Sequence, residues 1–235
     1  MLKTVSVEIK RMKKKMKIVA IGAVVMIMAS YMGLFQIINP QFIELPHNPI
    51  RVACVGDSIT QVSGYTAKLQ LLLGTKYIVG NFGVSGSAVS LKSTKPYMNQ
   101  TAFKKAEEFE PKVVVIMLGT NDARPSLSQF DESFEADYTS LVSSFQDLES
   151  NPQILVVKSP PIFTDNPDFS NTILANTLFP HIDNIANRLN VPTINVYNAF
   201  GDHSDYFMDG VHPNSEGAAL IASEVDNAII SDYSS

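Results

Sequence analysis

Apolar residues recur along the chain in short runs, and segments with a helical spacing of apolar positions separate these runs. The run at 113–118 (VVVIML) is continuously apolar and β-branched at its start, which is typical of a strand covered on both faces of a sheet. Shorter runs of the same kind predict four more strands. The five predicted strands cover residues 51–55, 77–82, 113–118, 154–158 and 193–197.

Helix-like segments alternate with these strands. The strongest is 131–149, where an apolar stripe with spacings of four and three predicts a face that packs on the core. The stripe consists of Phe134, Tyr138, Leu141, Phe145 and Leu148. The other predicted helices cover 65–73, 101–110, 181–189 and 215–230, the last with Asn214 as its N-cap. This alternation predicts an α/β fold, a three-layer α/β/α sandwich around a five-stranded parallel sheet, with sites at the carboxyl ends of the strands.

The N-terminal region has a different pattern. Residues 18–38 carry no charge, and a helix of that length spans roughly 31 Å, the thickness of a bilayer's hydrocarbon core. Residues 1–17 hold seven basic residues and one acid, which predicts a cytoplasmic tail, a transmembrane signal anchor at 18–38 and an extracytoplasmic domain. The proline-containing stretch 39–49 predicts a linker to a domain at 50–235. The alternative is a cleaved signal peptide and a secreted domain, although the apolar region of such a peptide usually has about 7–15 residues.

Charge and cysteine content narrow the function further. The net charge of −5 combines +6 before residue 18 with −11 after it, because the remainder holds 11 basic and 22 acidic residues. An acidic body argues against a nucleic-acid partner, since binding to phosphates needs a cationic face. The single cysteine, Cys54, lies in an apolar run and is predicted to be a buried, inert thiol.

Two of the segments that follow predicted strands hold a candidate nucleophile and its base. Ser58 lies in GDSIT at 56–60, where Gly56 allows a sharp turn and a helix start brings backbone N–H groups near the hydroxyl. Asp209 and His212 lie in DGVHPN at 209–214, where a carboxylate three residues before an imidazole can orient it as a base. The structural alternatives are an ordinary helix cap at Ser58 and a loop histidine at His212.

Two further segments offer hydrogen-bond donors for a developing oxyanion. Asn121 lies in GTND at 119–122 after the strongest strand, and a neutral side-chain amide is a directional donor. Residues 83–86 offer backbone N–H groups at a strand-to-loop turn. An Asx turn is the common alternative for Asn121. Each segment alone is a modest signal, whereas the four together, each after a strand, predict a hydrolytic site.

These segments resemble the motif blocks of the SGNH/GDSL hydrolases over residues 50 to about 230. The matching blocks are GDSIT at 56–60, NFGVSG at 81–86, GTND at 119–122 and DGVHPN at 209–214. The resemblance implies a flavodoxin-like fold and a serine esterase that needs no metal or other cofactor. It implies Ser58 as nucleophile, Asp209 and His212 as its triad partners, and an oxyanion hole made by Ser58, Gly86 and Asn121.

The segments VVVIMLGTNDARP, KSPPIF and DGVHPNSEGA resemble the branch that removes acetyl groups from sugars, which implies a carbohydrate ester as substrate. Asp57, Asp122 and Arg124 are candidate substrate contacts, with surface ion pairing as the alternative for Asp122 and Arg124. The stretch after Ser58 is shorter than the resemblance leads us to expect. The G-x-S-x-G nucleophile elbow is absent, which argues against an α/β-hydrolase fold.

Three other functions compete with a carbohydrate acetylesterase. A lysophospholipase or other lipid esterase of the same fold would suit a membrane tether. A metal-dependent phosphodiesterase would use the cluster of Asp202, His203, Asp205, Asp209 and His212. A non-catalytic carbohydrate-binding surface module would leave Ser58 unreactive. Chelation tests the metal-dependent alternative and fluorophosphonate labelling tests the binding module, whereas the preferred acyl chain length of the ester separates a lipid esterase from an acetylesterase.

Overall fold

The computed structural model describes residues 48–233, and within them all side chains except those at 128–132 and 231–233. The predicted basic tail at 1–17, the predicted transmembrane segment at 18–38 and residues 39–47 of the predicted linker lie outside the described residues. Within the described range, no helix combines the length and apolar character needed to cross a bilayer.

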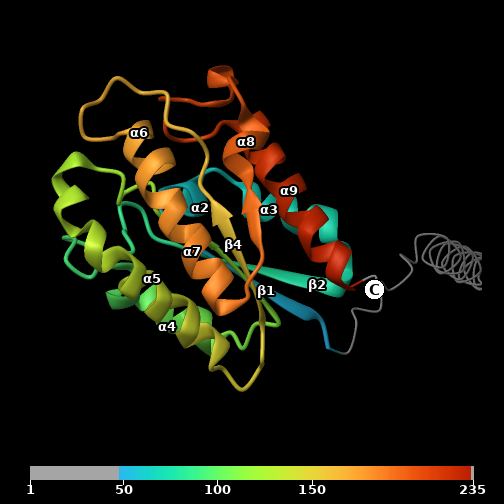
Figure 1. Cartoon of the computed structure of the whole chain (residues 1–235). Helices are drawn as coiled ribbons and strands as arrows, with labels where there is room; N and C mark the ends of the chain where they lie inside the picture. Colours follow the sequence, from blue (N-terminus) through green and yellow to red (C-terminus); the bar gives the residue numbers. More distant parts are fainter. Residues whose placement is uncertain (1–47, 234–235) are drawn as a thin grey trace, which may run out of the picture. The chain divides into compact units, whose positions relative to one another are not determined.

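Five parallel strands form one sheet in the order β2-β1-β3-β4-β5 (Figure 1). The strands are β1 Ile50–Gly56, β2 Tyr77–Gly83, β3 Val113–Met117, β4 Gln153–Lys158 and β5 Thr193–Asn195. This is the strand order of flavodoxin-like doubly wound sheets. Every residue of the central strand β3 is buried, as its continuous apolar run predicted. The predicted five-stranded parallel sheet is therefore confirmed.

Helices cover both faces of the sheet because alternate residues of each strand point to opposite sides. Val52 and Cys54 of β1 point to one face of the sheet, where they pack in one apolar cluster with a first layer of helices. Ala53 and Val55 pack in a second cluster with the other layer. The first layer contains α3 Tyr65–Leu73, α8 Val196–Phe200 and α9 Ser215–Tyr233. The second contains α4 Thr101–Glu108, α5 Asp131–Gln146 and α7 Phe179–Leu189.

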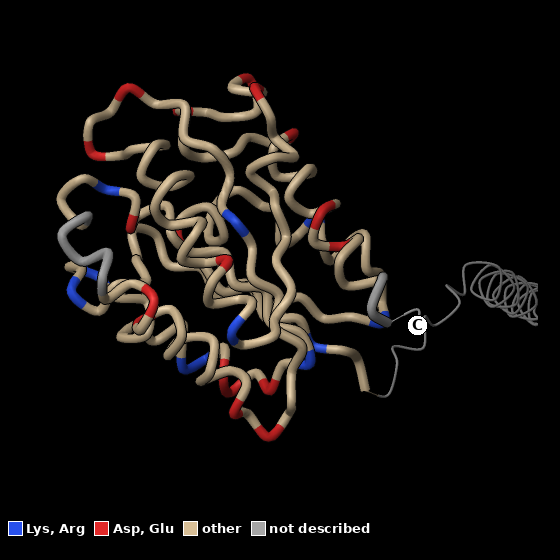
Figure 2. Tube along the Cα trace, in the orientation of Figure 1, with Lys and Arg blue, Asp and Glu red and all other residues tan. Residues whose placement is uncertain are grey.

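Short helical segments complete the path between these elements. They are α2 Ser58–Val62, η1 Gly74–Lys76, η2 Tyr97–Asn99, η3 Pro125–Phe130, α6 Asn171–Ile173, the π-turn η4 Leu174–Leu178, and η5 Ser204–Tyr206. The connection from α2 to α3 consists of Ser63 and Gly64 alone, so the stretch after Ser58 departs from the longer one that the resemblance implied. Lys and Arg are spread over the described chain without gathering on one face (Figure 2).

Most predicted elements are found within a few residues of their expected bounds, although β3 ends one residue and β5 two residues earlier than predicted. The fifth strand was expected at 193–197 but ends at Asn195, whose side chain accepts a hydrogen bond from Asn198 N (3.0 Å) and caps α8. Of the predicted stripe on α5, Leu148 falls beyond the end of the helix, whereas the other four side chains are buried. Asn214 caps α9 through Glu216 N and Gly217 N, as predicted.

Candidate active site

The candidate residues gather at the carboxyl end of the sheet, where β1 and β3 send the chain to opposite sides. This is the crevice in which ligands bind in open α/β sheets. Ser58 is the first residue of α2, and Asp57 alone separates it from the end of β1. Asp57 caps this helix, because its Oδ1 accepts a hydrogen bond from Ile59 N (2.9 Å). The cap and the helix start hold the Ser58 hydroxyl at the edge of the sheet.

Ser58, His212 and Asp209 form one hydrogen-bonded chain. The Ser58 Oγ lies 2.9 Å from His212 Nε2, and His212 Nδ1 lies 2.7 Å from Asp209 Oδ2. A carboxylate accepts and does not donate, so this geometry assigns the proton of the neutral ring to Nδ1. Nε2 is then free to accept the proton of the Ser58 hydroxyl. The fold brings Ser58 to the Asp209–His212 pair, although 154 positions of sequence separate Ser58 from His212.

The turn at 209–212 holds the carboxylate in place. Asp209 Oδ1 accepts hydrogen bonds from Val211 N (3.0 Å) and His212 N (2.7 Å). Partial burial alone would raise the pKa of the Asp209 carboxyl, but the hydrogen bonds from His212 and Val211 outweigh it and lower the pKa. Asp209 therefore stays ionised beside the imidazole at neutral pH.

Glycine is required at position 210 for two reasons. Its φ is +81°, and a Cβ there would lie 2.7 Å from Thr164 N. The loop after β4 contacts the turn at this point, where Phe163 N donates to Gly210 O (2.7 Å). The KSPPIF segment singled out in the sequence thus supports the turn that carries His212.

Asn121 lies after β3 with its amide held at both ends. Its Nδ2 donates to Ser87 O (3.0 Å) and lies 3.5 Å from Asp57 Oδ2, while its Oδ1 accepts from Arg124 Nη2 (3.3 Å). One amide hydrogen is therefore engaged with Ser87, and the second has only a long contact with Asp57. This second amide hydrogen is the one that can form a hydrogen bond to a ligand oxygen.

The loop after β2 presents backbone N–H groups. Gly86 has a φ of +75°, a left-handed conformation that favours glycine. Within residues 48–233, the N–H groups of Gly86 and Ser58 donate to no protein acceptor. They are thus available to a ligand oxygen.

Two tethers that the sequence analysis did not identify fix this loop. Gln61 Oε1 accepts from Ser85 N (2.9 Å) and from the Ser85 hydroxyl, which ties α2 to the loop. The Asp122 carboxylate accepts from Val89 N and Ser90 N, each at 2.9 Å. No local sequence signal marks these contacts, because each joins residues that lie more than twenty positions apart.

Asp57 and Asp122, predicted as candidate substrate contacts, are internal residues. They are 1% and 3% exposed, and each carboxylate accepts hydrogen bonds from the protein. Burial raises the pKa of Asp57 to about 7 and that of Asp122 to about 6, although backbone N–H donors oppose both shifts. Their geometry does not support direct contact with a substrate or a surface ion pair.

Arg124 is half-buried and its guanidinium lies over the ring of Phe169, 4.7 Å from the centroid. Its hydrogen bond goes to Asn121 rather than to a surface carboxylate. Arg124 therefore lies beside the site, in contact with a predicted oxyanion donor.

The acidic cluster proposed as a metal site does not converge. His203 stacks on Tyr206 and lies 3.3 Å from Asp205, while Asp209 and His212 belong to the chain that ends at Ser58. Among the described residues, no three His, Cys, Asp or Glu side chains are arranged to bind one metal ion.

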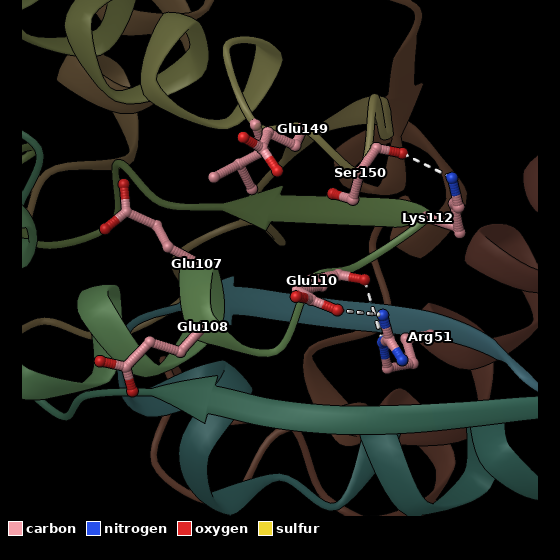
Figure 3. Close-up of a pocket in the computed structure, with 8 residues that line it drawn as sticks. Arg51, Glu107, Glu108, Glu110, Lys112, Glu149 and Ser150 are labelled. Atoms are coloured by element: carbon pink, nitrogen blue, oxygen red, sulfur yellow. Dashed lines mark hydrogen bonds and ion pairs between the residues drawn. The ribbon is translucent and has the colours of Figure 1, made fainter.

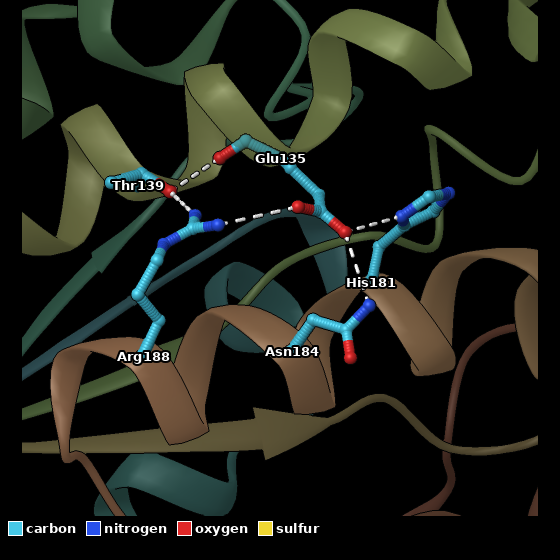
Figure 4. Close-up of polar contacts among 5 residues, drawn as sticks. All are labelled: Glu135, Thr139, His181, Asn184 and Arg188. Atoms are coloured by element: carbon cyan, nitrogen blue, oxygen red, sulfur yellow. Dashed lines mark hydrogen bonds and ion pairs between the residues drawn. The ribbon is translucent and has the colours of Figure 1, made fainter.

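Two other polar regions lie away from Ser58. A pocket beside the amino ends of β1 and β3 is lined by Glu107, Glu108, Glu110, Glu149 and neighbouring residues (Figure 3). In this pocket Arg51 forms an ion pair with Glu110 (3.0 Å), and Lys112 donates a hydrogen bond to Ser150 O (2.7 Å). Between α5 and α7, His181 Nδ1 lies 2.8 Å from Glu135 Oε1 (Figure 4). His181 thus joins α7 to α5 through Glu135.

Cys54 is buried, and burial raises the pKa of its thiol to about 12. Its burial is as predicted, and the raised pKa disfavours the reactive thiolate.

Comparisons with known proteins agree with the resemblance found in the motifs. The sequence model of the GDSL-like lipase/acylhydrolase family matches residues 54–220. An acetylxylan esterase of Xylanibacter ruminicola is 32% identical, and the match covers 77% of this chain and 43% of the relative. The chain therefore spans less than half the length of that curated relative.

Solved structures share the fold. A carbohydrate acetylesterase from Sinorhizobium meliloti has a TM-score of 0.64 and 18% identity, covering 77% of this chain and 99% of that one. The aryl esterase of M. smegmatis has a TM-score of 0.60 and 19% identity, with the same coverage of 77% and 99%. At these identities the likeness concerns the three-layer fold.

Proposed function

This chain belongs to the GDSL-like lipase/acylhydrolase family, and on that premise we propose that it is a serine esterase with Ser58 as nucleophile. One observation carries the proposal, namely the continuous hydrogen-bonded chain from Ser58 Oγ through His212 to Asp209, with distances of 2.9 Å and 2.7 Å. A serine hydroxyl is a weak nucleophile until a base accepts its proton, and this chain supplies an oriented base.

In the first half of the reaction, His212 Nε2 accepts the Ser58 proton while Oγ attacks the ester carbonyl carbon. The Asp209 carboxylate stabilises the imidazolium that forms. The C–O bond to the alcohol then breaks, and the imidazolium returns its proton to the leaving alcohol. In the second half, His212 takes a proton from water, the hydroxide attacks the acyl-enzyme, and Ser58 leaves with the proton.

The negative charge that develops on the carbonyl oxygen needs donors that are already in place. The N–H groups of Ser58 and Gly86 and the second amide hydrogen of Asn121 supply them in this proposal. Gln61 and Asp122 support the arrangement, since they hold the loop that carries Gly86. Folding already fixes these N–H donors in place, so little reorganisation is needed when negative charge develops on the carbonyl oxygen.

We further propose short-chain esters, chiefly acetyl groups on carbohydrates, as the substrate class. The similarity to an acetylxylan esterase at 32% identity supports this choice. Lipid esters remain the competing class within the same chemistry, and acyl chain length separates the two.

The test is hydrolysis of p-nitrophenyl esters from acetate to dodecanoate by residues 40–235, with acetylated xylo-oligosaccharides alongside. We expect the highest kcat/KM with acetate and release of acetate from the oligosaccharides. An optimum at octanoate or longer would reject the carbohydrate acetylesterase in favour of a lipid esterase. Activity that disappears with EDTA and returns with a metal ion would instead support the phosphodiesterase-like alternative.

Labelling separates an enzyme from a binding module. A fluorophosphonate should modify the wild-type chain at Ser58 and leave Ser58→Ala unmodified. A wild-type chain that resists the reagent and hydrolyses no ester would reject the esterase proposal.

We also propose that the domain is tethered on the outer side of a membrane by residues 18–38. The uncharged run and the seven basic residues before it support this placement. In cells that express the full chain, carbonate washing should leave it in the membrane fraction, and protease added outside should digest the domain. Recovery of the chain in the medium without residues 1–38 would support signal-peptide cleavage instead.

A further inference from the structure

Arg124 contacts the oxygen of the Asn121 side-chain amide, whereas the N–H groups of that amide face the other way. Arg124 Nη2 donates to Asn121 Oδ1 (3.3 Å), whereas Asn121 Nδ2 faces the acceptors Ser87 O and Asp57 Oδ2. A flipped amide would turn its oxygen toward two acceptors and its NH₂ group toward the guanidinium. The three contacts together therefore specify a single amide orientation.

The guanidinium of Arg124 is itself held in place. It lies over the Phe169 ring, and Ser170 N donates to Ala123 O (3.0 Å), which ties the segment that carries Phe169 to the turn that carries Arg124. A planar guanidinium stacked on an aromatic ring loses less side-chain entropy when it forms a hydrogen bond than a mobile cation does. Asn121 is 5% exposed, so the Arg124–Asn121 contact lies at the margin of the core.

We propose that Arg124 is a positioning residue for ester hydrolysis, which holds and polarises the Asn121 amide so that one N–H points to the reacting oxygen. This inference rests on the proposed function. A cation on the amide oxygen draws electron density away from the N–H groups and makes them stronger donors. The benefit is largest when the ligand oxygen carries negative charge, so it affects the transition state more than substrate binding.

The primary test uses Arg124→Met and Arg124→Lys with p-nitrophenyl acetate. For Arg124→Met we expect kcat to fall about tenfold to fiftyfold, less than for loss of an oxyanion donor itself, with KM changed by less than about twofold. Arg124→Lys keeps a charge but loses the stacked planar donor, and should recover part of the loss. Since Lys retains the positive charge beside Phe169, it also provides a folded variant should Arg124→Met prove unstable.

A second readout separates positioning from general structural support. Phenylboronic acid adds to a reactive serine as a tetrahedral adduct, so its inhibition constant should weaken by the same factor as kcat. Arg188→Met is the matched control, because Arg188 on α7 is a partly exposed arginine that likewise bonds to side chains, here Glu135 and Thr139. That control should keep kcat and the boronate affinity within about twofold of wild type.

A double-mutant cycle tests the route through Asn121. In an Asn121→Ala background, Arg124→Met should cause no further loss of kcat, because the amide that it positions is gone. The proposal is overturned if Arg124→Met keeps kcat and boronate affinity within about twofold, or if its loss persists undiminished without Asn121. An inactive wild-type chain whose Ser58 resists fluorophosphonate would overturn the proposed function, and this inference with it.

Discussion

His212 and His181 each lie next to a carboxylate, in two different parts of the fold. His212 Nδ1 lies 2.7 Å from Asp209 at the carboxyl end of the sheet, and His181 Nδ1 lies 2.8 Å from Glu135 between α5 and α7. The two pairs have nearly the same distance and the same ring nitrogen, so the pair alone does not distinguish them.

The hydroxyl groups around the two pairs do distinguish them. His212 Nε2 faces Ser58 Oγ at 2.9 Å, at the start of a helix with N–H groups nearby. His181, Glu135, Thr139, Asn184 and Arg188 form the second polar cluster, between α5 and α7 (Figure 4). In this cluster the Thr139 hydroxyl donates to Glu135 O and accepts from Arg188 Nη2. A histidine–carboxylate pair can activate a serine only where its other ring nitrogen meets that hydroxyl, and donors for the oxyanion must lie beside it.

The largest expected effect is that of removing the hydroxyl. Ser58→Ala should lower kcat with p-nitrophenyl acetate on the order of 10⁴-fold or more, because the nucleophile is lost. Thr139→Val removes the hydroxyl of the second cluster and should leave kcat within about twofold while it lowers stability by about 1 kcal/mol. Steady-state kinetics and urea unfolding check the two variants. Comparable activity losses would show that the two clusters were wrongly distinguished.

The next effect comes from the carboxylates. Asp209→Asn should lower kcat by roughly 10³–10⁴, because an amide no longer selects the ring tautomer with the proton on Nδ1. Glu135→Gln should reduce the melting temperature and leave kcat near wild type. A stopped assay over several enzyme concentrations measures the residual activity. An Asp209→Asn variant with nearly full activity would contradict the assigned relay.

The oxyanion donor should have a smaller effect than the relay. Asn121→Ala should reduce kcat by about 10²–10³ with a much smaller change in KM. Asn184→Ala is the control, because Asn184 donates its amide to Glu135 Oε1 (3.3 Å) in the second cluster. It should leave kcat and KM unchanged. Equal losses in the two variants would mean that the Asn121 amide is structural.

The smallest expected effect is on how the free energy of unfolding changes with pH. The change should have opposite signs for Asp57, beside Ser58, and for Glu135, beside His181. Burial raises the pKa of Asp57 to about 7, so its contribution to stability is full below the unfolded value and is lost as pH rises through about 7. The hydrogen bond from His181 lowers the pKa of Glu135, so its contribution is present above the unfolded value and is lost as pH falls.

Urea unfolding of Asp57→Asn and Glu135→Gln tests this difference in sign. Relative to wild type, Asp57→Asn should gain stability from about pH 5 to about pH 8, since it cannot ionise. The stability deficit of Glu135→Gln should shrink as pH falls below the ordinary range of a glutamate. Parallel pH profiles for the two variants would contradict the opposite pKa directions.

The elements that the sequence predicted well are those set by local pattern. The strand at 113–118 was predicted from an unbroken apolar run and the stripe on α5 from a 3.6-residue period, and a single segment carries each pattern. The fifth strand was predicted too long because Val196 and Tyr197 fit a strand, whereas the Asn195 side chain starts a helix there.

The residues of the candidate site likewise divide into those that a local motif predicted and those whose surroundings it did not predict. The motifs that hold Ser58, Asp209 and His212 contain the residue types of a nucleophile and its base. The sequence alone was therefore enough to predict these three residues as candidates. The surroundings of Asp57 and Asp122 could not be predicted from the sequence, because burial and, for Asp122, partners more than thirty positions away define them.

By itself, then, the sequence determined the alternation of elements, the edge of the sheet at which polar residues collect, and the candidate nucleophile with its base. Only the tertiary structure decided which polar groups face inward and which amide hydrogen is left for a ligand. The physical reason is that Asn121 is oriented by Ser87, Asp57 and Arg124, and two of these lie more than thirty positions away. Contacts of that range depend on packing, which no local pattern encodes.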